Sequence, residues 1–455
     1  MTTRRDFLSR TLGGSSLLAV GGIVPEFLAS TAAAADKDPK GKDTILVVVE
    51  MTGGNDGLNM VAPYGDDLYQ KLRPTLAHTR REILKIDDYV GLHPRMTEMK
   101  ALYEKKHLAI VQGVGYPNPD RSHFESMDIW QLGDPKRSQS NGWLARTIPG
   151  MNVNEAGVPG MFIGQERLPL AMQGADGGVI SLADRESFHL KLTGNEKPRK
   201  KLLEDLNSGD DTSADLAAFV RKRQLQTYTS LKKIEEALSD IGQPSQPVPV
   251  PRPGRPQPAN NESLATLNGK LNLIGRLINK GLGTRLYYAS IVGFDTHSGQ
   301  ADQHAELLGE VSSAIGGFFT TLGSNVGRVV LVTYSEFGRR VKENGSRGTD
   351  HGAASCMFVA GAKVSGGLVG KHPKLDDLTD GDLKYSTDFR SVYASLLDNW
   401  LGVDSKGVLG DTFVDLKLID HAKKVDVPPG VPGPVPKTSG IAPPPLPAPP
   451  VPVKE

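Results

Sequence analysis

Carboxylate and imidazole side chains follow several of the buried apolar runs in this sequence, at the point where each run ends. Carboxylate oxygen and imidazole nitrogen are ligand atoms with which proteins bind Zn, Mn, Mg or Ca, and geometry decides which metal is held. The pattern predicts a site for a divalent metal. The predicted metal ligands are Asp56, Asp295, His297, Glu336, Asp350 and His351.

Ser122 and His123 are the predicted catalytic residues. They come after the second apolar run, 108–111, and a Pro-Asn-Pro-Asp turn, where a helix is predicted to begin. Backbone N–H groups at a helix N-terminus stabilise an anion, so a serine hydroxyl there is placed to act as a nucleophile. Taken alone, Ser122 is better explained as the residue that caps this helix than as a nucleophile, and His123 would then only cover the start of the helix.

Each group of predicted metal ligands also has an ordinary structural interpretation. The Gly-Gly-Asn-Asp-Gly sequence at 53–57 is typical of a simple turn. The Asp and His of 295–297 face one side of an extended chain, either as two ligands or as part of a surface turn. Glu336 ends a buried strand and needs a metal, Arg339 or Arg340 as its partner, because an unpaired buried charge is costly.

Apolar β-branched runs alternate with amphipathic stretches along most of the chain. Strands are predicted at 45–49, 108–111, 161–163, 285–291, 329–333 and 357–360. Helices are predicted at 93–106, 122–130, 264–281, 303–322 and 389–401. Continuous apolar strands are typical of a mostly parallel sheet that helices cover on both faces. We therefore predict an α/β protein with a three-layer α/β/α sandwich, whose strand ends bring the polar residues to one rim.

The first 35 residues have the features of an export signal. Arg4 and Arg5 precede a short apolar stretch and a run of alanines, which is the order found in a twin-arginine signal peptide. The apolar stretch is shorter than the ~20 residues of a membrane span, so no span is predicted in the mature form. We expect a bacterial protein that the twin-arginine machinery exports, already folded, to the periplasm or the exterior.

Two further segments differ in composition from the rest of the chain. Residues 195–262 are charged and then Pro-rich, which predicts a surface insertion in one domain that spans 43–402. Residues 427–455 are rich in Pro and Val and are predicted to form a disordered tail.

The formal net charge of +1 argues against nucleic acid or an anionic membrane as the main partner. With Cys356 as the single cysteine, no internal disulfide can form.

The order of the polar motifs resembles that of a known family. The motifs are Gly53-Gly54-Asn55-Asp56-Gly57-Leu58-Asn59, Gly293-Phe294-Asp295-Thr296-His297, Ser335-Glu336-Phe337-Gly338-Arg339 and Asp350-His351-Gly352. Over residues 43–402 they resemble the domain of unknown function 1501 family, which is regarded as a distant relative of the alkaline phosphatase and sulfatase superfamily. That resemblance implies an alkaline-phosphatase-like sandwich with a metal site that hydrolyses phosphate or sulfate esters.

The resemblance also implies roles for individual residues. Asp56, Asp295, His297 and His351 resemble the metal ligands of the superfamily, and Ser122 takes the place of its nucleophile. Asp350 or a backbone carbonyl would then orient the imidazole of His351.

The sequence departs from the superfamily pattern in two places. Glu336 is followed by Phe337 where an Asp-His pair is usual, so one imidazole ligand is missing. The sulfatase Cys-x-Pro-x-Arg signature is absent from the corresponding stretch, 118–123. These departures leave the metal count open at one or two, and His123 is a replacement ligand or a general acid.

The favoured function is that of an exported, metal-dependent hydrolase of phosphate or sulfate esters, with a small molecule or a glycan as substrate. The alternative is a non-catalytic envelope protein with the same fold that binds a glycan or a protein. A metal-free hydrolase that uses Ser122 and His123 ranks last, because side chains of adjacent residues rarely reach each other productively.

Overall fold

The computed structural model describes residues 43–151, 158–174, 179–183, 234 and 263–425. The predicted signal peptide and the predicted tail lie outside these residues, as does the predicted insertion at 195–262 except for Ile234. Within the described part of the chain, no helix is both long enough and apolar enough to span a membrane.

A nine-stranded sheet runs through the described part of the protein. Its strands are β1 (Ile45–Thr52), β5 (Leu108–Gly115), β6 (Gly160–Ile163), β7 (Val179–Leu182), β8 (Leu286–Val292), β9 (Val329–Tyr334), β10 (Ser355–Ala360), β11 (Gly367–Val369) and β14 (Thr387–Asp388). They lie in the order β11-β5-β10-β9-β1-β8-β6-β7, and β14 pairs with β5. The central strand β1 is buried along nearly its whole length, as its apolar sequence predicts.

The sheet is mostly parallel, as predicted, with one reversed strand. β1 is parallel to β8 and β9, and Val48 lies opposite Tyr288 and Val332. β10 is antiparallel to both β9 and β5. The chain leaves β9 at the carboxyl edge of the sheet and enters β10 from that same edge. The loop between them, 335–354, therefore lies wholly on the edge where a site was predicted.

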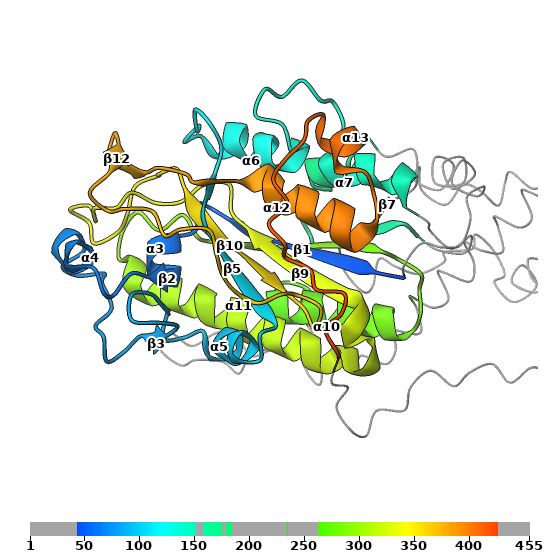
Figure 1. Cartoon of the computed structure of the whole chain (residues 1–455), viewed down its shortest axis with the longest axis horizontal. Coiled ribbons are helices and arrows are strands. Elements are labelled where there is room, and N and C mark those ends of the chain that lie inside the picture. Colours follow the sequence, from blue (N-terminus) through cyan, green and yellow to red (C-terminus); the bar gives the residue numbers. More distant parts are fainter. Residues whose placement is uncertain (1–42, 152–157, 175–178, 184–233, 235–262, 426–455) are drawn as a thin grey trace, which may run out of the picture.

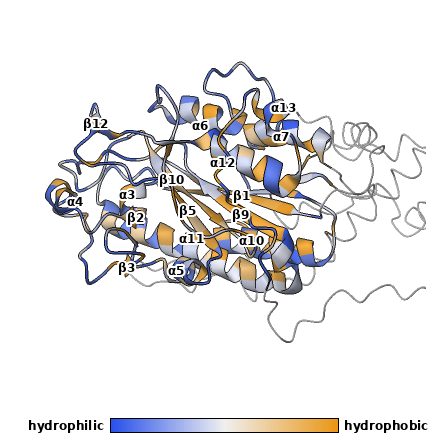
Figure 2. Cartoon of the chain, in the orientation of Figure 1, coloured by the Kyte–Doolittle hydropathy of each residue, from blue (hydrophilic) through white to orange (hydrophobic). Residues whose placement is uncertain are grey.

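Helices cover both faces of the sheet, which confirms the three-layer prediction (Figure 1). One face carries α5 (Thr97–Glu104), α10 (Leu267–Asn279) and α11 (Gln300–Leu322). The other face carries α6 (His123–Leu132), α7 (Trp143–Thr147), α12 (Phe389–Leu396) and α13 (Ser405–Leu409). In Figure 2 the strands form a hydrophobic layer between helices whose outer sides are more polar.

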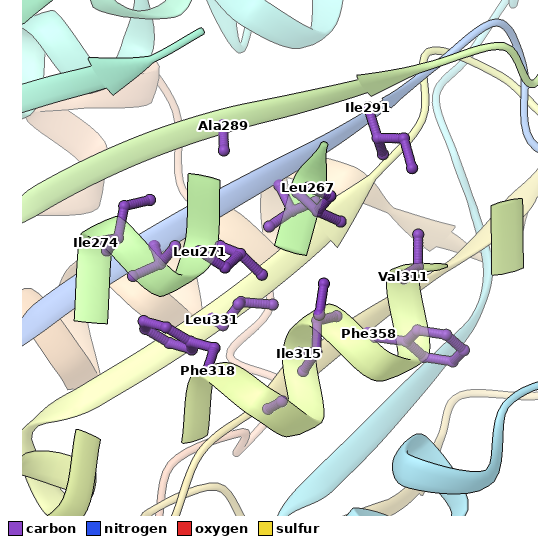
Figure 3. Packing of buried hydrophobic residues seen from close by; sticks show 14 of the residues in the cluster. Leu267, Leu271, Ile274, Ala289, Ile291, Val311, Ile315, Phe318, Leu331 and Phe358 are labelled. Carbon is purple, nitrogen blue, oxygen red and sulfur yellow. The ribbon is translucent and has the colours of Figure 1, made fainter. Parts of the chain in front are cut away.

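The core consists of two apolar layers, one on each side of the sheet. Val47 and Val49 of β1 belong to the layer under α10 and α11, and Val48 belongs to the layer under α6 and α12. Figure 3 shows Leu271 of α10 and Phe318 of α11 packed over the strands. Each such fully buried side chain contributes about 1.5–3 kcal/mol through removal of apolar surface from water. This packing makes the sheet a rigid base for the loops at its edge.

Short elements complete the described structure. The helices are α3 (Gly57–Met60) and α4 (Asp67–Leu72), with 3-10 turns at Ile148–Gly150, Leu170–Met172 and Gly323–Arg328 and a π-helical turn at Leu397–Leu401. A small sheet joins β2 (Val61–Ala62), β4 (Gly91–Leu92) and β3 (Leu84–Lys85), and β12 (Leu378–Thr379) pairs with β13 (Asp382–Leu383). The helix predicted at 389–401 is thus divided into α12 and the π-helical turn that follows it.

Candidate metal centre

Three side chains converge at the carboxyl edge of the sheet. His123 is the first residue of α6 and follows β5, Asp295 follows β8, and His351 lies in the loop between β9 and β10. One nitrogen or oxygen atom from each of the three lies within 4.8 Å of the others. The convergence predicted from the strand ends is therefore present in part: the cluster includes His123, which was predicted to be catalytic, but neither Asp56 nor Glu336.

His297 joins this cluster through its Nε2 atom. The distance from His297 Nε2 to His351 Nε2 is 2.9 Å, and the distance to Asp295 Oδ1 is 3.0 Å. His351 Nε2 in turn lies 3.1 Å from Asp295 Oδ1. Three potential ligand atoms thus lie around one point.

Each of the three histidines is hydrogen-bonded through Nδ1. His123 Nδ1 lies 2.7 Å from Glu336 Oε1, His351 Nδ1 lies 2.8 Å from the carbonyl oxygen of Arg121, and His297 Nδ1 lies 3.4 Å from Asp350 Oδ1. Since all three partners are acceptors, we assign the proton of each neutral ring to Nδ1. The Nε2 lone pairs then face the carboxylate of Asp295.

The arrangement fits a divalent cation. Lone pairs of two imidazoles and a carboxylate repel one another at 2.9–3.1 Å unless a proton or a cation lies between them. Ligand bonds of about 2.0–2.2 Å at roughly right angles give ligand atoms these separations. Hydrogen bonding of the second ring nitrogen is the usual support of a metal-binding histidine. We identify His123, Asp295, His297 and His351 as the residues suited to hold a metal.

Arg339 fixes the carboxylate of Asp295. The guanidinium is completely buried and donates to Asp295 Oδ1 at 2.7 Å, to the carbonyl oxygens of Gly54 and Thr349 and to two further carbonyls. Partial burial acts to raise the pKa of Asp295, but the hydrogen bond and the charge of Arg339 outweigh it and lower this pKa to about 2. The Asp295 carboxylate is therefore ionised throughout the neutral range.

Glu336 supports His123 and is already satisfied by hydrogen bonds. Its buried carboxylate accepts from the backbone N–H of Gly53 at 2.9 Å and from the Ser335 hydroxyl at 3.0 Å, besides the 2.7 Å contact with His123. The hydrogen bond with Glu336 raises the pKa of His123. Arg339, one of the two arginines predicted to pair with Glu336, binds Asp295 instead, so this part of the prediction is corrected.

The Gly-rich turn at 53–57 is required by close packing at the site. Gly53 has a φ of +120°, and a Cβ atom on it would lie 2.5 Å from the backbone nitrogen of Asp295. Any larger residue would push the turn away from Asp295 and break the hydrogen bond from Gly53 to Glu336. The turn therefore positions the cluster with its backbone.

Asp56 in the same turn lies outside the cluster, although it was predicted to be a ligand. Its carboxylate forms a completely buried ion pair with Arg73 at 2.5 Å and also accepts from Gln300. Burial acts to raise the pKa of Asp56, but the Arg73 charge outweighs this and the pKa is lowered. A guanidinium thus occupies the position beside Asp56 that a metal would take, and we leave Asp56 out of the metal centre.

Asp350 and Ser122 lie at the margin of the cluster. Asp350 is exposed and contacts His297, whereas the backbone carbonyl of Arg121 orients His351, so the second of the two predicted alternatives for His351 holds. Ser122 is exposed at the N-cap of α6, but its side chain makes no capping hydrogen bond. The hydroxyl of Ser122 is consequently not committed to the helix.

The comparisons with known proteins agree with the motif order. The family model described as "Protein of unknown function (DUF1501)" matches residues 43–425. The chain belongs to this family. A search of curated proteins returns no match.

Solved structures resemble the chain only distantly. The C-terminal periplasmic domain of EcEptC from Escherichia coli, in complex with Zn, is 9% identical, with 71% of this chain and 74% of that chain covered and a TM-score of 0.33. Lipoteichoic acid synthase LtaP from Listeria monocytogenes is 8% identical, with coverages of 86% and 81% and a TM-score of 0.33. A protein in the alkaline phosphatase superfamily from Vibrio parahaemolyticus is 9% identical, with coverages of 88% and 79% and a TM-score of 0.28. With TM-scores below 0.5, we conclude nothing about the site or the activity from these likenesses.

Proposed function

We propose that this DUF1501 chain is an exported, metal-dependent hydrolase of phosphate or sulfate esters. The observation that carries the proposal is the orientation of three histidines, each held at Nδ1 by an acceptor and presenting Nε2 to Asp295. Acceptors from three separate parts of the chain have to be arranged to produce this convergence. A solvated surface cluster has no need of such support.

One divalent ion would be held by the cluster: its ligands would be His123, Asp295, His297 and His351. When bound, such an ion acts as a Lewis acid that offsets negative charge on the oxygens of a phosphoryl or sulfuryl group. Arg339 keeps the Asp295 carboxylate ionised and in place, and Glu336 keeps the His123 ring in its orientation. We propose a single ion because Arg73 already neutralises Asp56.

Ser122 is the proposed nucleophile. Its hydroxyl is exposed, adjoins His123 in sequence and makes no capping hydrogen bond to α6. In the first step its Oγ would bond to phosphorus or sulfur while the ester bond to the alcohol breaks, and the Oγ proton would pass through water to the leaving alcohol. In the second step a water oxygen would bond to phosphorus or sulfur while the bond to Oγ breaks, and a proton of that water would return to Oγ as phosphate or sulfate leaves. The N–H groups at the start of α6 favour the anionic group during both steps.

A non-catalytic glycan-binding protein remains the second candidate, and one observation favours it. Phe124, the residue after His123, is 85% exposed. An aromatic ring beside a polar site provides a surface on which a sugar ring can stack. The same ring would serve a hydrolase whose substrate is a glycan ester.

The test is to purify the protein through its own export route and measure both metal content and ester hydrolysis. We expect about one equivalent of a divalent metal per chain, and hydrolysis of 4-nitrophenyl phosphate or 4-nitrophenyl sulfate that chelation abolishes. Bound metal without hydrolysis of either ester would favour the glycan-binding protein. Absence of metal after supply of Zn, Mn, Mg and Ca would refute the proposed site.

Export itself is tested by the same preparation. Replacement of Arg4 and Arg5 by Lys should leave the chain folded inside the cell and absent outside the inner membrane. An exported species that still carries residues 1–35 would contradict the proposed signal peptide.

A further inference from the structure

We propose that Arg121 and Arg340 bind a second negative charge on the substrate, located on the alcohol part of the ester. This inference rests on the proposed function, because it places these two residues beside the site that would hold the ester group. The substrate class that follows is a phosphate or sulfate ester whose alcohol part also bears a carboxylate, phosphate or sulfate.

The backbone of each of the two arginines lies next to His351. The carbonyl oxygen of Arg121 accepts from His351 Nδ1 at 2.8 Å. Arg339 and His351 form an antiparallel bridge, and the next residue, Arg340, donates its backbone N–H to the Asp350 carbonyl at 3.0 Å. Arg121 therefore lies next to the metal centre in the segment before α6, and Arg340 lies next to it in the loop after β9.

Their side chains meet at one buried carboxylate, that of Asp382 in β13. Arg121 contacts Asp382 Oδ2 through Nε at 2.7 Å and Nη2 at 2.5 Å. Arg340 Nε lies 3.6 Å from Oδ1, which is too long for a hydrogen bond. Oδ1 of Asp382 is buried without a hydrogen-bond partner among the described residues. Two guanidinium groups thus share one carboxylate. The single negative charge of Asp382 can compensate only one of their two positive charges.

This pair differs from the other two arginines near the site. Arg73 and Arg339 are completely buried, and their N–H groups are bound to carboxylates and carbonyl oxygens. The side chains of Arg121 and Arg340 are 39% and 38% exposed. Their outward N–H groups face solvent beside the metal centre. A guanidinium is suited to carboxylate, phosphate and sulfate because its planar fork donates two parallel hydrogen bonds.

Asp380 and Asp350 are exposed carboxylates that oppose this charge, and Asp350 also contacts His297. Asp380 lies two residues before Asp382, and burial and, to a smaller extent, the Asp380 charge act to raise the pKa of Asp382. Removal of the Asp380 charge should therefore strengthen anion binding, whereas removal of a guanidinium should weaken it. Asp380 has a φ of +53°, a conformation that asparagine also tolerates, so Asp380→Asn tests the charge with little strain.

The experiment measures, by calorimetry, the binding affinity of two probes, phenyl phosphate and 4-carboxyphenyl phosphate. Each probe is titrated into full-length protein loaded with metal and into full-length protein treated with a chelator. Wild type should bind the carboxylated probe about tenfold more tightly, the effect of one charge-assisted hydrogen bond. Arg340→Gln should remove this preference, and Arg340→Lys should restore only part of it. Arg121→Lys keeps a cation on Asp382 but loses the planar fork, and it should weaken the preference without unfolding the protein. Lys342→Gln, which removes an exposed cation from the same loop, should leave the preference unchanged.

The arms of the experiment separate this inference from the proposed function. Dependence of phenyl phosphate binding on metal tests the proposed function. The difference between the two probes, and its loss in Arg340→Gln, tests the arginine pair with or without metal. Equal binding of the two probes by wild type, or an unchanged preference in Arg340→Gln, would overturn the inference.

Discussion

His297 Nε2 and His351 Nε2 lie 2.9 Å apart, although each ring already donates its Nδ1 proton to an acceptor on its far side. Two lone pairs therefore face each other next to the carboxylate of Asp295. A cation between these atoms would remove the repulsion of the lone pairs. The affinity of the site for a metal therefore depends on the hydrogen bonds that Nδ1 of His297 and Nδ1 of His351 make on the outer sides of the two rings.

Loss of either ring should abolish metal binding while the fold is kept. His297→Ala and His351→Ala each remove one ligand on a loop, and the apolar layers of the core are unaffected. We expect metal affinity to fall by more than about 100-fold, since loss of a supporting residue alone typically costs about 10–100-fold. Elemental analysis and thermal unfolding measure the two effects separately.

The matched control is His421→Asn. His421 lies in a different region, where its Nε2 contacts the carbonyl oxygen of Asn399. Metal content should stay at the wild-type level in this variant. If His297→Ala and His351→Ala retained the metal as well, the cluster would not be the binding site.

Asp56→Asn should have the opposite phenotype, a loss of stability with the metal site intact. The substitution leaves the completely buried guanidinium of Arg73 without its carboxylate. Removal of one partner of a buried ion pair costs about 3–5 kcal/mol in the free energy of unfolding. Denaturant unfolding measures the loss, and metal analysis of the folded fraction should still give one equivalent. Loss of metal from folded Asp56→Asn would show that Asp56 is a ligand after all.

The fold was predictable where a strand is buried on both faces. The runs that became β1, β8 and β9 are continuous and apolar, because helices cover them on both sides. The short edge strand β11 was not predicted, since its three residues are only partly buried and carry little pattern. The reversed direction of β10 was also not predictable, because an apolar run contains no information about its direction in the sheet.

The candidate site was predictable as far as strand ends determine it. Asp295, His297 and His351 converge because the loops that carry them leave the same edge of the sheet. Asp56 also follows a strand, yet Arg73, which is 17 residues away in sequence, folds over it. Spacing along the chain does not show which carboxylate receives a protein cation and which is left for a metal.

Glu50 should give the protein a measurable loss of stability between pH 4.5 and 7. Its carboxyl group is buried in β1, where Tyr288, Gln131 and Thr52 donate to it. Burial raises the pKa of Glu50 from 4.5 to about 7, in spite of these hydrogen bonds. The folded protein therefore holds a proton that the unfolded chain releases near pH 4.5.

The sign of this effect follows from proton binding in the two states. Below pH 4.5 both states are protonated and Glu50 has no effect. As the pH rises to about 7, the unfolded state ionises first, so the free energy of unfolding falls by about 3 kcal/mol in total. In Glu50→Gln this decrease should be absent, as measured by denaturant unfolding at pH 5 and pH 8. An equal pH dependence in both proteins would contradict the raised pKa.

Ser122→Ala should abolish hydrolysis with almost no change in stability. The side chain of Ser122 makes no capping hydrogen bond to α6, so its loss should change the free energy of unfolding by less than about 0.5 kcal/mol. Ser122→Asp has a side chain suited to capping but no hydroxyl, and it should also be stable and inactive. Ser122→Thr retains a hydroxyl and should recover part of the activity. Metal content and hydrolysis of 4-nitrophenyl phosphate, measured on all three variants, distinguish a nucleophile from a ligand. Activity that survives in both Ser122→Ala and Ser122→Asp, with metal bound, would exclude Ser122 as the nucleophile and make water the attacking group.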